Sequence, residues 1–126
     1  MDVEEMYEEF RIQFPDLTLA ADARHVKIWD SVERETAYVW FESLANTLNT
    51  MMATPEHRTD FSSIFNYFDE KFRVGNKDEK NCIEVSFVEN LFWQVGPRHA
   101  APVWARLPTR LQQLYIGFHG RAPKLD

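Results

Sequence analysis

Five large apolar residues recur at helical spacing in the middle of the chain, and they constrain the fold more than any other feature of the sequence. They are Phe61, Ile64, Phe65, Phe68 and Phe72. The i, i+3, i+4, i+7 spacing places such side chains on one face of an α-helix, so the segment predicts a helix with a deeply buried aromatic face. A second predicted helix runs from residue 77 to Val95, and from Ile83 onward it is apolar around most of its circumference. The two segments together predict a buried helical hairpin.

The residues at the ends of this hairpin are typical of helix termini. Thr59 or Asp60 can cap the first helix by accepting hydrogen bonds from its free backbone N–H groups. Gly75 suits a left-handed residue just past the end of that helix. Asn76 and Glu79 have the spacing of a capping box, which predicts that the second helix begins there.

Outside the hairpin, apolar residues show helical spacing in three segments, near 2–13, 31–53 and 107–118. The prolines that follow the hairpin indicate an ordered loop over 98–106. The stretch 17–30 alternates only weakly between apolar and polar residues, which leaves a short strand, an irregular segment or the start of a helix open.

Length and composition predict one core for the whole chain. The chain has 126 residues, of which 44% are hydrophobic, and a chain of this length can bury a core without disulfides. Cys82 is the only cysteine, so it has no internal partner for a disulfide. We therefore expect an all-α fold, a single-domain bundle of about five helices over residues 1–120, with a frayed tail at 121–126.

The charge is negative and unevenly distributed. Residues 1–96 hold 9 Lys and Arg against 19 Asp and Glu, a net charge of −10, whereas residues 97–126 hold 5 against 1, a net charge of +4. Binding to a phosphate backbone depends on cations that displace counterions, so nucleic acid is not an expected partner. The acidic body favours a basic partner, although surplus acid also serves solubility.

The sequence also predicts where the protein resides. Asp2, Glu4 and Glu5 follow Met1 where a secretory signal has basic and then apolar residues, and the chain has no apolar run of 18 residues. A lone cysteine fits a reducing compartment. We therefore expect a cytoplasmic protein without membrane association.

Residues that carry catalytic or metal chemistry are scattered. The four histidines are His25, His57, His99 and His119. None of them stands at metal-ligand spacing from another histidine or from Cys82, and the cysteine lies in an apolar segment where burial would raise its pKa. The chain has no glycine-rich phosphate loop and no nucleophile elbow. The sequence thus predicts no metal site, no cofactor, no catalytic residues and no enzyme activity.

Five carboxylates are the candidates for contact with a partner. Four of them cluster in sequence around the predicted hairpin bend, and the fifth lies on the second helix. They are Asp69, Glu70, Asp78, Glu79 and Glu84. Charged side chains that project from one end of a hairpin can bind a partner through charge-assisted hydrogen bonds. Solvation of an exposed surface explains the same residues equally well.

The hairpin carries a resemblance to a known group of proteins. The motifs that carry it are Ile64-Phe65-Asn66-Tyr67-Phe68-Asp69-Glu70, Gly75-Asn76 and Asn81-Cys82-Ile83-Glu84-Val85-Ser86-Phe87-Val88-Glu89-Asn90-Leu91. Over about residues 36–95 the chain resembles small helical bacterial proteins, several of which look like immunity proteins of contact-dependent growth inhibition and related polymorphic toxin systems. The resemblance implies a protein that neutralises a cognate toxin by stoichiometric contact with its C-terminal toxin domain. An acidic immunity protein suits a basic nuclease toxin.

One alternative to this interpretation, and one question about the tryptophans, stay open. The chain can be a small helical adaptor or regulator that binds another cytosolic protein. Three tryptophans, Trp29, Trp93 and Trp104, can be interface anchors, although we expect them in the core.

Overall fold

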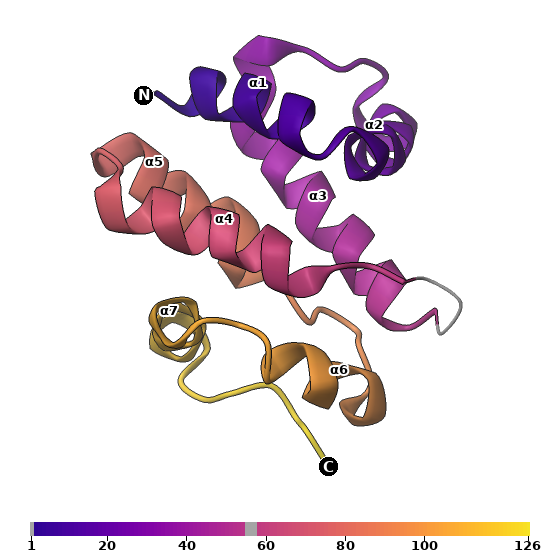
Figure 1. The fold of residues 1–126 in the computed structure, drawn as a ribbon. Coiled ribbons are helices and arrows are strands. Elements are labelled where there is room, and N and C mark those ends of the chain that lie inside the picture. The colour runs from indigo at the N-terminus through magenta and orange to yellow at the C-terminus, as the bar shows by residue number, and fades with distance from the viewer. Residues whose placement is uncertain (1, 55–57) are drawn as a thin grey trace.

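The computed structural model describes residues 2–54 and 58–126, and these form seven α-helices and no β-strand (Figure 1). The helices are α1 (Val3–Gln13), α2 (Pro15–Trp29), α3 (Ala37–Met52), α4 (Phe61–Val74), α5 (Lys77–Cys82), α6 (Pro97–Trp104) and α7 (Thr109–His119). A short 3₁₀ helix, η1 (Arg34–Thr36), precedes α3. The all-α prediction is confirmed, whereas the predicted number of about five helices is too low.

The α4–α5 hairpin lies between two groups of helices (Figure 1). On one side are α1 and α2, and on the other are α6 and α7. Helix α3 contacts α1, α2 and α6 as well as the segment that follows α5, so it connects the two groups.

Aromatic rings from four segments fill the core. Phe10 of α1 stacks on Phe68 of α4 with ring centroids 5.5 Å apart, and Phe68 stacks in turn on Phe87 at 3.9 Å. Trp40 and Phe41 of α3 pack edge-on against the Phe10 ring. All five of these side chains have no exposed area. Of the stripe predicted for α4, Ile64, Phe65 and Phe68 are buried, whereas Phe61 and Phe72 at its two ends are partly buried.

A charged group ties the first three helices together. The Arg11 guanidinium of α1 donates two hydrogen bonds of 2.8 Å to the Asp22 carboxylate of α2. The indole N–H of Trp40 in α3 donates a third, also of 2.8 Å. Burial acts to raise the pKa of Asp22, but the hydrogen bonds from Arg11 and Trp40 outweigh it and hold the pKa below its usual value.

The hairpin begins and bends largely as the sequence predicts. Asp60 accepts a hydrogen bond from the Ser63 N–H and so caps α4, and Asn76 and Glu79 form the predicted capping box of α5. The prediction for Gly75 is wrong, because its backbone is extended, with φ −73° and ψ 165°. A glycine is required there for another reason, since an added Cβ would overlap the carbonyl oxygen of Lys71.

The second helix of the hairpin is shorter than the predicted 77–95. Helix α5 ends at Cys82 and continues as a π-helical turn, η2 (Ile83–Phe87), and a 3₁₀ turn, η3 (Val88–Asn90). The buried side chains of Ile83 and Phe87 keep the inward-facing spacing through this irregular stretch. The apolar pattern therefore reports burial correctly, but it does not distinguish a regular helix from a distorted one.

Two segments outside the hairpin are helices, although the sequence left the structure of the first open and predicted a loop for the second. The stretch 17–30 lies almost entirely in α2, so neither the short strand nor the irregular segment exists there. The expected loop 98–106 is mostly helix α6, in which Pro97 takes the first position, where a missing N–H costs nothing. After α7, residues 121–126 form no regular structure, and Leu125 is partly buried against the core. The predicted fraying of this tail stays a prediction.

The membrane prediction concerns the length and hydropathy of helices. No helix formed by residues 2–54 or 58–126 combines the length and the apolar character that crossing a bilayer requires.

Candidate functional site

The start of α1 is a well-ordered, acidic helix terminus. The Glu5 N–H donates to Oδ1 of Asp2 at 2.8 Å, and the Asp2 N–H donates to Oε1 of Glu5 at 3.3 Å, which closes a capping box. Acidic side chains in the first turn also interact favourably with the positive end of the helix dipole. Residues close together in the sequence therefore determine where α1 begins and make that end of the helix acidic.

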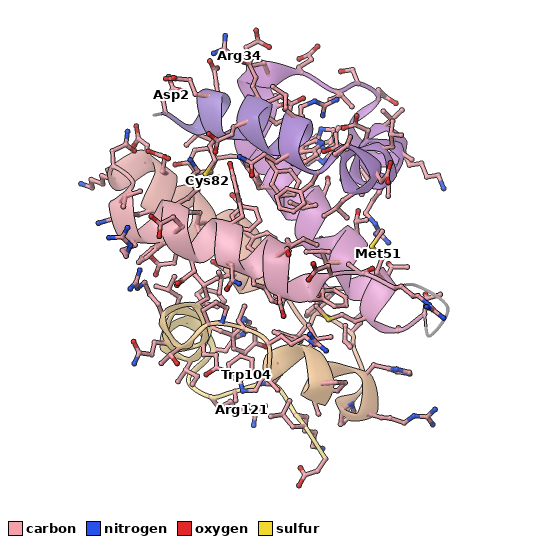
Figure 2. All side chains as sticks on the ribbon, viewed as in Figure 1. Asp2, Arg34, Met51, Cys82, Trp104 and Arg121 are labelled. Carbon is pink, nitrogen blue, oxygen red and sulfur yellow. The ribbon has the colours of Figure 1, made fainter. Side chains whose placement is uncertain are left out.

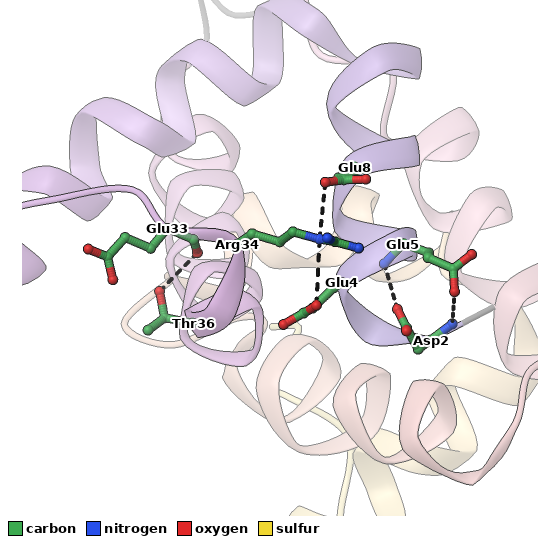
Figure 3. Close-up of polar contacts among 7 residues, drawn as sticks. All are labelled: Asp2, Glu4, Glu5, Glu8, Glu33, Arg34 and Thr36. Carbon is green, nitrogen blue, oxygen red and sulfur yellow. Dashed lines mark hydrogen bonds and ion pairs between the residues drawn. The ribbon is translucent and has the colours of Figure 1, made fainter.

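The short helix η1 brings further charge to the same place (Figure 3). Its Arg34 side chain reaches between two carboxylates of α1, with Nε 3.0 Å from Glu8 and 3.5 Å from Glu4. The Thr36 hydroxyl donates to the Glu33 carbonyl at 3.1 Å and so steadies the turn that carries Arg34. The ion pairs hold η1 against α1.

We call this surface the acidic corner. It consists of Asp2, the N-cap residue of α1, of Glu4, Glu5 and Glu8 in α1, and of Glu33 and Glu35 in the η1 segment. Within chain segments 2–8 and 33–36, Arg34 is the one cation among these six carboxylates. Burial raises the pKa of the Tyr7 hydroxyl; Arg11 opposes this effect, and the carboxylates of Asp22, Glu8 and Glu35 add to it. Figure 2 shows Asp2 and Arg34 together at the end of the molecule opposite Arg121.

Two of the predicted site residues, Asp69 and Glu70, lie on α4 beside cations. Glu70 accepts hydrogen bonds of 2.6 and 3.1 Å from Arg73, and this contact holds the pKa of Glu70 below its usual value. Asp69 faces Arg110 of α7, with 4.0 Å between Oδ1 and Nε. An arginine therefore lies beside each of these two carboxylates.

The other three predicted residues have different surroundings. Glu79 is only 2% exposed and serves the capping box of α5, so its side chain does not reach the surface. Asp78 is exposed, and its backbone carbonyl accepts a hydrogen bond of 3.0 Å from Tyr38, at the start of α3 just beyond η1. Glu84 is exposed in the π-helical turn. The structure therefore does not gather the five predicted carboxylates into one surface, and only Asp78 lies next to the η1–α3 segment.

The histidines and the cysteine are dispersed. His25 is buried and its Nδ1 lies 2.8 Å from the Ser43 hydroxyl, whereas His119 stacks on Tyr115 near the surface. Burial raises the pKa of Cys82 to about 12. Across the described ranges, no three His, Cys, Asp or Glu side chains lie close enough together to hold a metal ion. His57 lies outside the described residues.

Sequence reasoning missed the acidic corner because the fold creates it. The acidic residues at the start of the chain carry a local signal, since they fall in the first two turns of the predicted helix 2–13. Nothing local links them to Glu33 and Glu35, about 25 to 30 positions later in the chain. Only the packing of η1 against α1 brings the two segments together.

Comparison with known proteins gives one match. The profile of a family described as a domain of unknown function, DUF7674, matches residues 7–120. No curated protein and no solved structure matches the chain. Since the match spans most of its length, the chain belongs to the DUF7674 family.

Proposed function

We propose that the protein is an immunity protein, which binds and neutralises a cognate bacterial toxin by stoichiometric contact. The observation that carries the proposal is the acidic corner, where six carboxylates lie on two separate elements and Arg34 of η1 forms ion pairs with two of them, Glu4 and Glu8 of α1. The proposal gives the protein a cytoplasmic location, a toxin domain as partner and no catalytic role or cofactor of its own.

The electrostatics of the corner suit a basic partner. Exposed carboxylates at one end of the molecule produce a negative potential that speeds encounter with a cationic surface. A nuclease toxin presents such a surface, because its cleft attracts phosphate. Carboxylates that occupy the cleft can take the place of phosphate groups and block access of the substrate.

The geometry of the corner also reduces the cost of binding. The capping box fixes the start of α1, and Arg34 holds η1 beside it, so the carboxylates need little reordering when a partner arrives. Asp78 lies where it can extend this surface, whereas Asp69 and Glu70 add little net potential beside Arg73 and Arg110.

The test is capture of the toxin and measurement of its binding. The tagged protein is used to recover partners from its own bacterium, and the recovered toxin domain is titrated against it at several salt concentrations. We expect a one-to-one complex that inhibits the toxin and weakens as salt rises. Recovery of a non-toxin regulatory protein in stoichiometric amounts would support the adaptor alternative instead.

A pair of charge reversals assigns the surface. Glu33→Lys with Glu35→Lys leaves the capping box and the Arg34 ion pairs in place, and we expect it to weaken toxin binding at least tenfold. The matched control is Asp16→Lys with Asp126→Lys, which changes the net charge equally at exposed positions outside the corner. Equal losses in both variants would show that net charge, and not this surface, governs binding.

A further inference from the structure

The turn that follows η3 has an unusual backbone. Phe92 and Gln94 both have positive φ angles, 68° and 56°, although neither is glycine. Such conformations cost free energy for residues that carry a Cβ, so the surrounding structure must impose them. Between these two residues Trp93 is 66% exposed, which contradicts the expectation that it belongs to the core.

A buried amide imposes this turn. The Asn49 side chain of α3 is 5% exposed; its Nδ2 donates to the Asn90 carbonyl at 2.8 Å, and its Oδ1 accepts the Phe92 N–H at 2.7 Å. The Phe92 ring is in turn packed edge-on against Trp104, with 5.6 Å between centroids. Trp93 is therefore presented to solvent by a rigid turn.

Trp93 stands at the edge of a groove along α3. One hollow of about 320 Å³ lies between Trp93 and the end of α3, and a second of about 460 Å³ lies between α2 and α3. Both are lined by Arg24 and Thr50, which are joined by a hydrogen bond of 2.5 Å, so the two hollows lie side by side on either side of this pair. Ile28 and Met51 add an apolar surface to the second hollow. We call the combined surface the Trp93 groove.

The charge of the Trp93 groove is opposite to the net charge of the larger chain segment that contains it. The residues that line it include Arg24 and Lys27 but no Asp or Glu among those described. The chain segment that builds it, residues 1–96, has a net charge of −10. A groove with two cations, an apolar wall and an exposed indole is complementary to an acidic ligand that also carries apolar side chains.

We propose that the Trp93 groove binds an acidic, amphipathic segment of a partner protein, with Trp93 as the anchor. The apolar side chains of the segment pack on Trp93, Ile28 and Met51, and its carboxylates pair with Arg24 and Lys27. This inference does not rest on the proposed function, because the acidic corner lies elsewhere and suits a partner of the opposite charge.

The test uses random 16-residue peptides displayed on phage and selected on the immobilised full-length protein at 150 mM salt. We expect the selected peptides to be enriched in Asp and Glu together with large apolar residues. Selection of basic peptides, or no common composition, would overturn the proposal. The strongest peptide is then synthesised with a fluorophore and titrated by fluorescence anisotropy.

Variants locate the binding site of that peptide. Trp93→Ala and Arg24→Glu each remove one contact, and we expect each to weaken the peptide about tenfold or more. The controls are Phe118→Ala and Arg98→Glu, which change an exposed aromatic residue and an exposed arginine outside the groove. Circular dichroism melts verify that all four variants fold.

The remaining outcomes also decide the question. Loss of binding in the two controls, or none in Trp93→Ala and Arg24→Glu, would place the peptide elsewhere and overturn the proposal. Sedimentation that shows a dimer at 150 mM salt, abolished by Trp93→Ala, would make a second copy the occupant and likewise overturn it. Glu33→Lys with Glu35→Lys is expected to weaken toxin binding but to leave peptide affinity unchanged. The two proposals can therefore be refuted independently of each other.

Discussion

The Asp22 carboxylate shows how single residues hold this fold together. Its two oxygens take three hydrogen bonds from two other helices, and the Arg11 guanidinium that donates two of them also lies over the Tyr7 ring, 5.0 Å from its centroid. Arg11 and Asp22 stabilise the fold only as a pair. Removing the Asp22 charge would leave the half-buried Arg11 guanidinium without a counterion, which costs free energy.

Asp22→Asn is therefore expected to destabilise the protein. The variant keeps the shape of the side chain but removes the charge that Arg11 faces, and we expect a loss of about 1–3 kcal/mol in the free energy of unfolding. Urea denaturation measures it. Glu4→Gln, which weakens an exposed ion pair with Arg34, should cost less than about 1 kcal/mol. Equal costs would show that the Asp22 contacts are no stronger than a surface pair.

His25 makes stability depend on pH. Burial lowers the pKa of His25, and the nearby Asp22 carboxylate opposes this only in part. The unfolded chain, with a histidine pKa of about 6.5, therefore takes up a proton before the folded chain does. Stability is lost as pH falls from about 6.5 toward the lower folded pKa, and it is unaffected by this group at higher pH.

The expected signature is a change of slope in His25→Gln. Unfolding free energies of the wild type and the variant, measured in urea between about pH 5 and pH 7.5, should differ in their dependence on pH, with the flatter curve for the variant. Parallel curves would mean that a group other than His25 causes the loss of stability at low pH.

At the scale of elements, the sequence predicts those helices whose buried face is regular. The 3.6-residue spacing finds α1, α3, α4 and α7 because each buries one stripe of large side chains. The same spacing does not reveal helix α2, because the apolar residues Leu19 and Val26 are exposed and do not belong to its buried face. Helix α6 is not predicted because its prolines indicate a loop, yet Pro97 stands at the first position of the helix and Pro102 is exposed within a helix of only eight residues.

The candidate site was less predictable than the helices, for a different physical reason. Carboxylates are soluble wherever they lie, so their local sequence says little about which of them become neighbours. The capping box places Glu79 inside the hairpin, although its sequence context resembles that of exposed Asp78. Contacts between distant segments, such as Arg34 with Glu8, decide the location of the acidic corner.

The hairpin core gives a direct test of this assignment of elements. Phe65 and Phe87 are fully buried and contact each other edge-on, so Phe65→Ala or Phe87→Ala should cost about 3–5 kcal/mol in denaturant unfolding. Phe118→Ala, at a ring that is 56% exposed, should cost less than about 1 kcal/mol. Small losses in all three variants would remove the hairpin from the core.

The bend between α4 and α5 gives a second test at this scale. Gly75→Ala should destabilise the protein by about 1–3 kcal/mol, because its Cβ overlaps the Lys71 carbonyl oxygen and crowds Glu79. Gly96→Ala is the matched control, since a Cβ there meets nothing within 4 Å, and its effect should stay within about 1 kcal/mol of zero. Thermal or urea melts that show equal effects would contradict the close approach at Gly75.

At the scale of the whole molecule, charge is separated between two ends. The acidic corner lies beside α1, and the cations of the C-terminal segment lie in or after α6 and α7 on the other side of the hairpin (Figures 1 and 2). These cations are Arg98, Arg106, Arg110, Arg121 and Lys124. The hairpin between them keeps the two ends apart and in a fixed orientation.

This separation has a consequence for concentrated solutions of the protein. A uniform sphere with a net charge of −6 would repel its copies at every distance, most strongly in dilute buffer. A molecule with one acidic and one basic end can instead attract its neighbours head to tail when little salt screens them. Light scattering should then give a second virial coefficient that rises on addition of salt, so the protein becomes more colloidally stable in the saltier buffer.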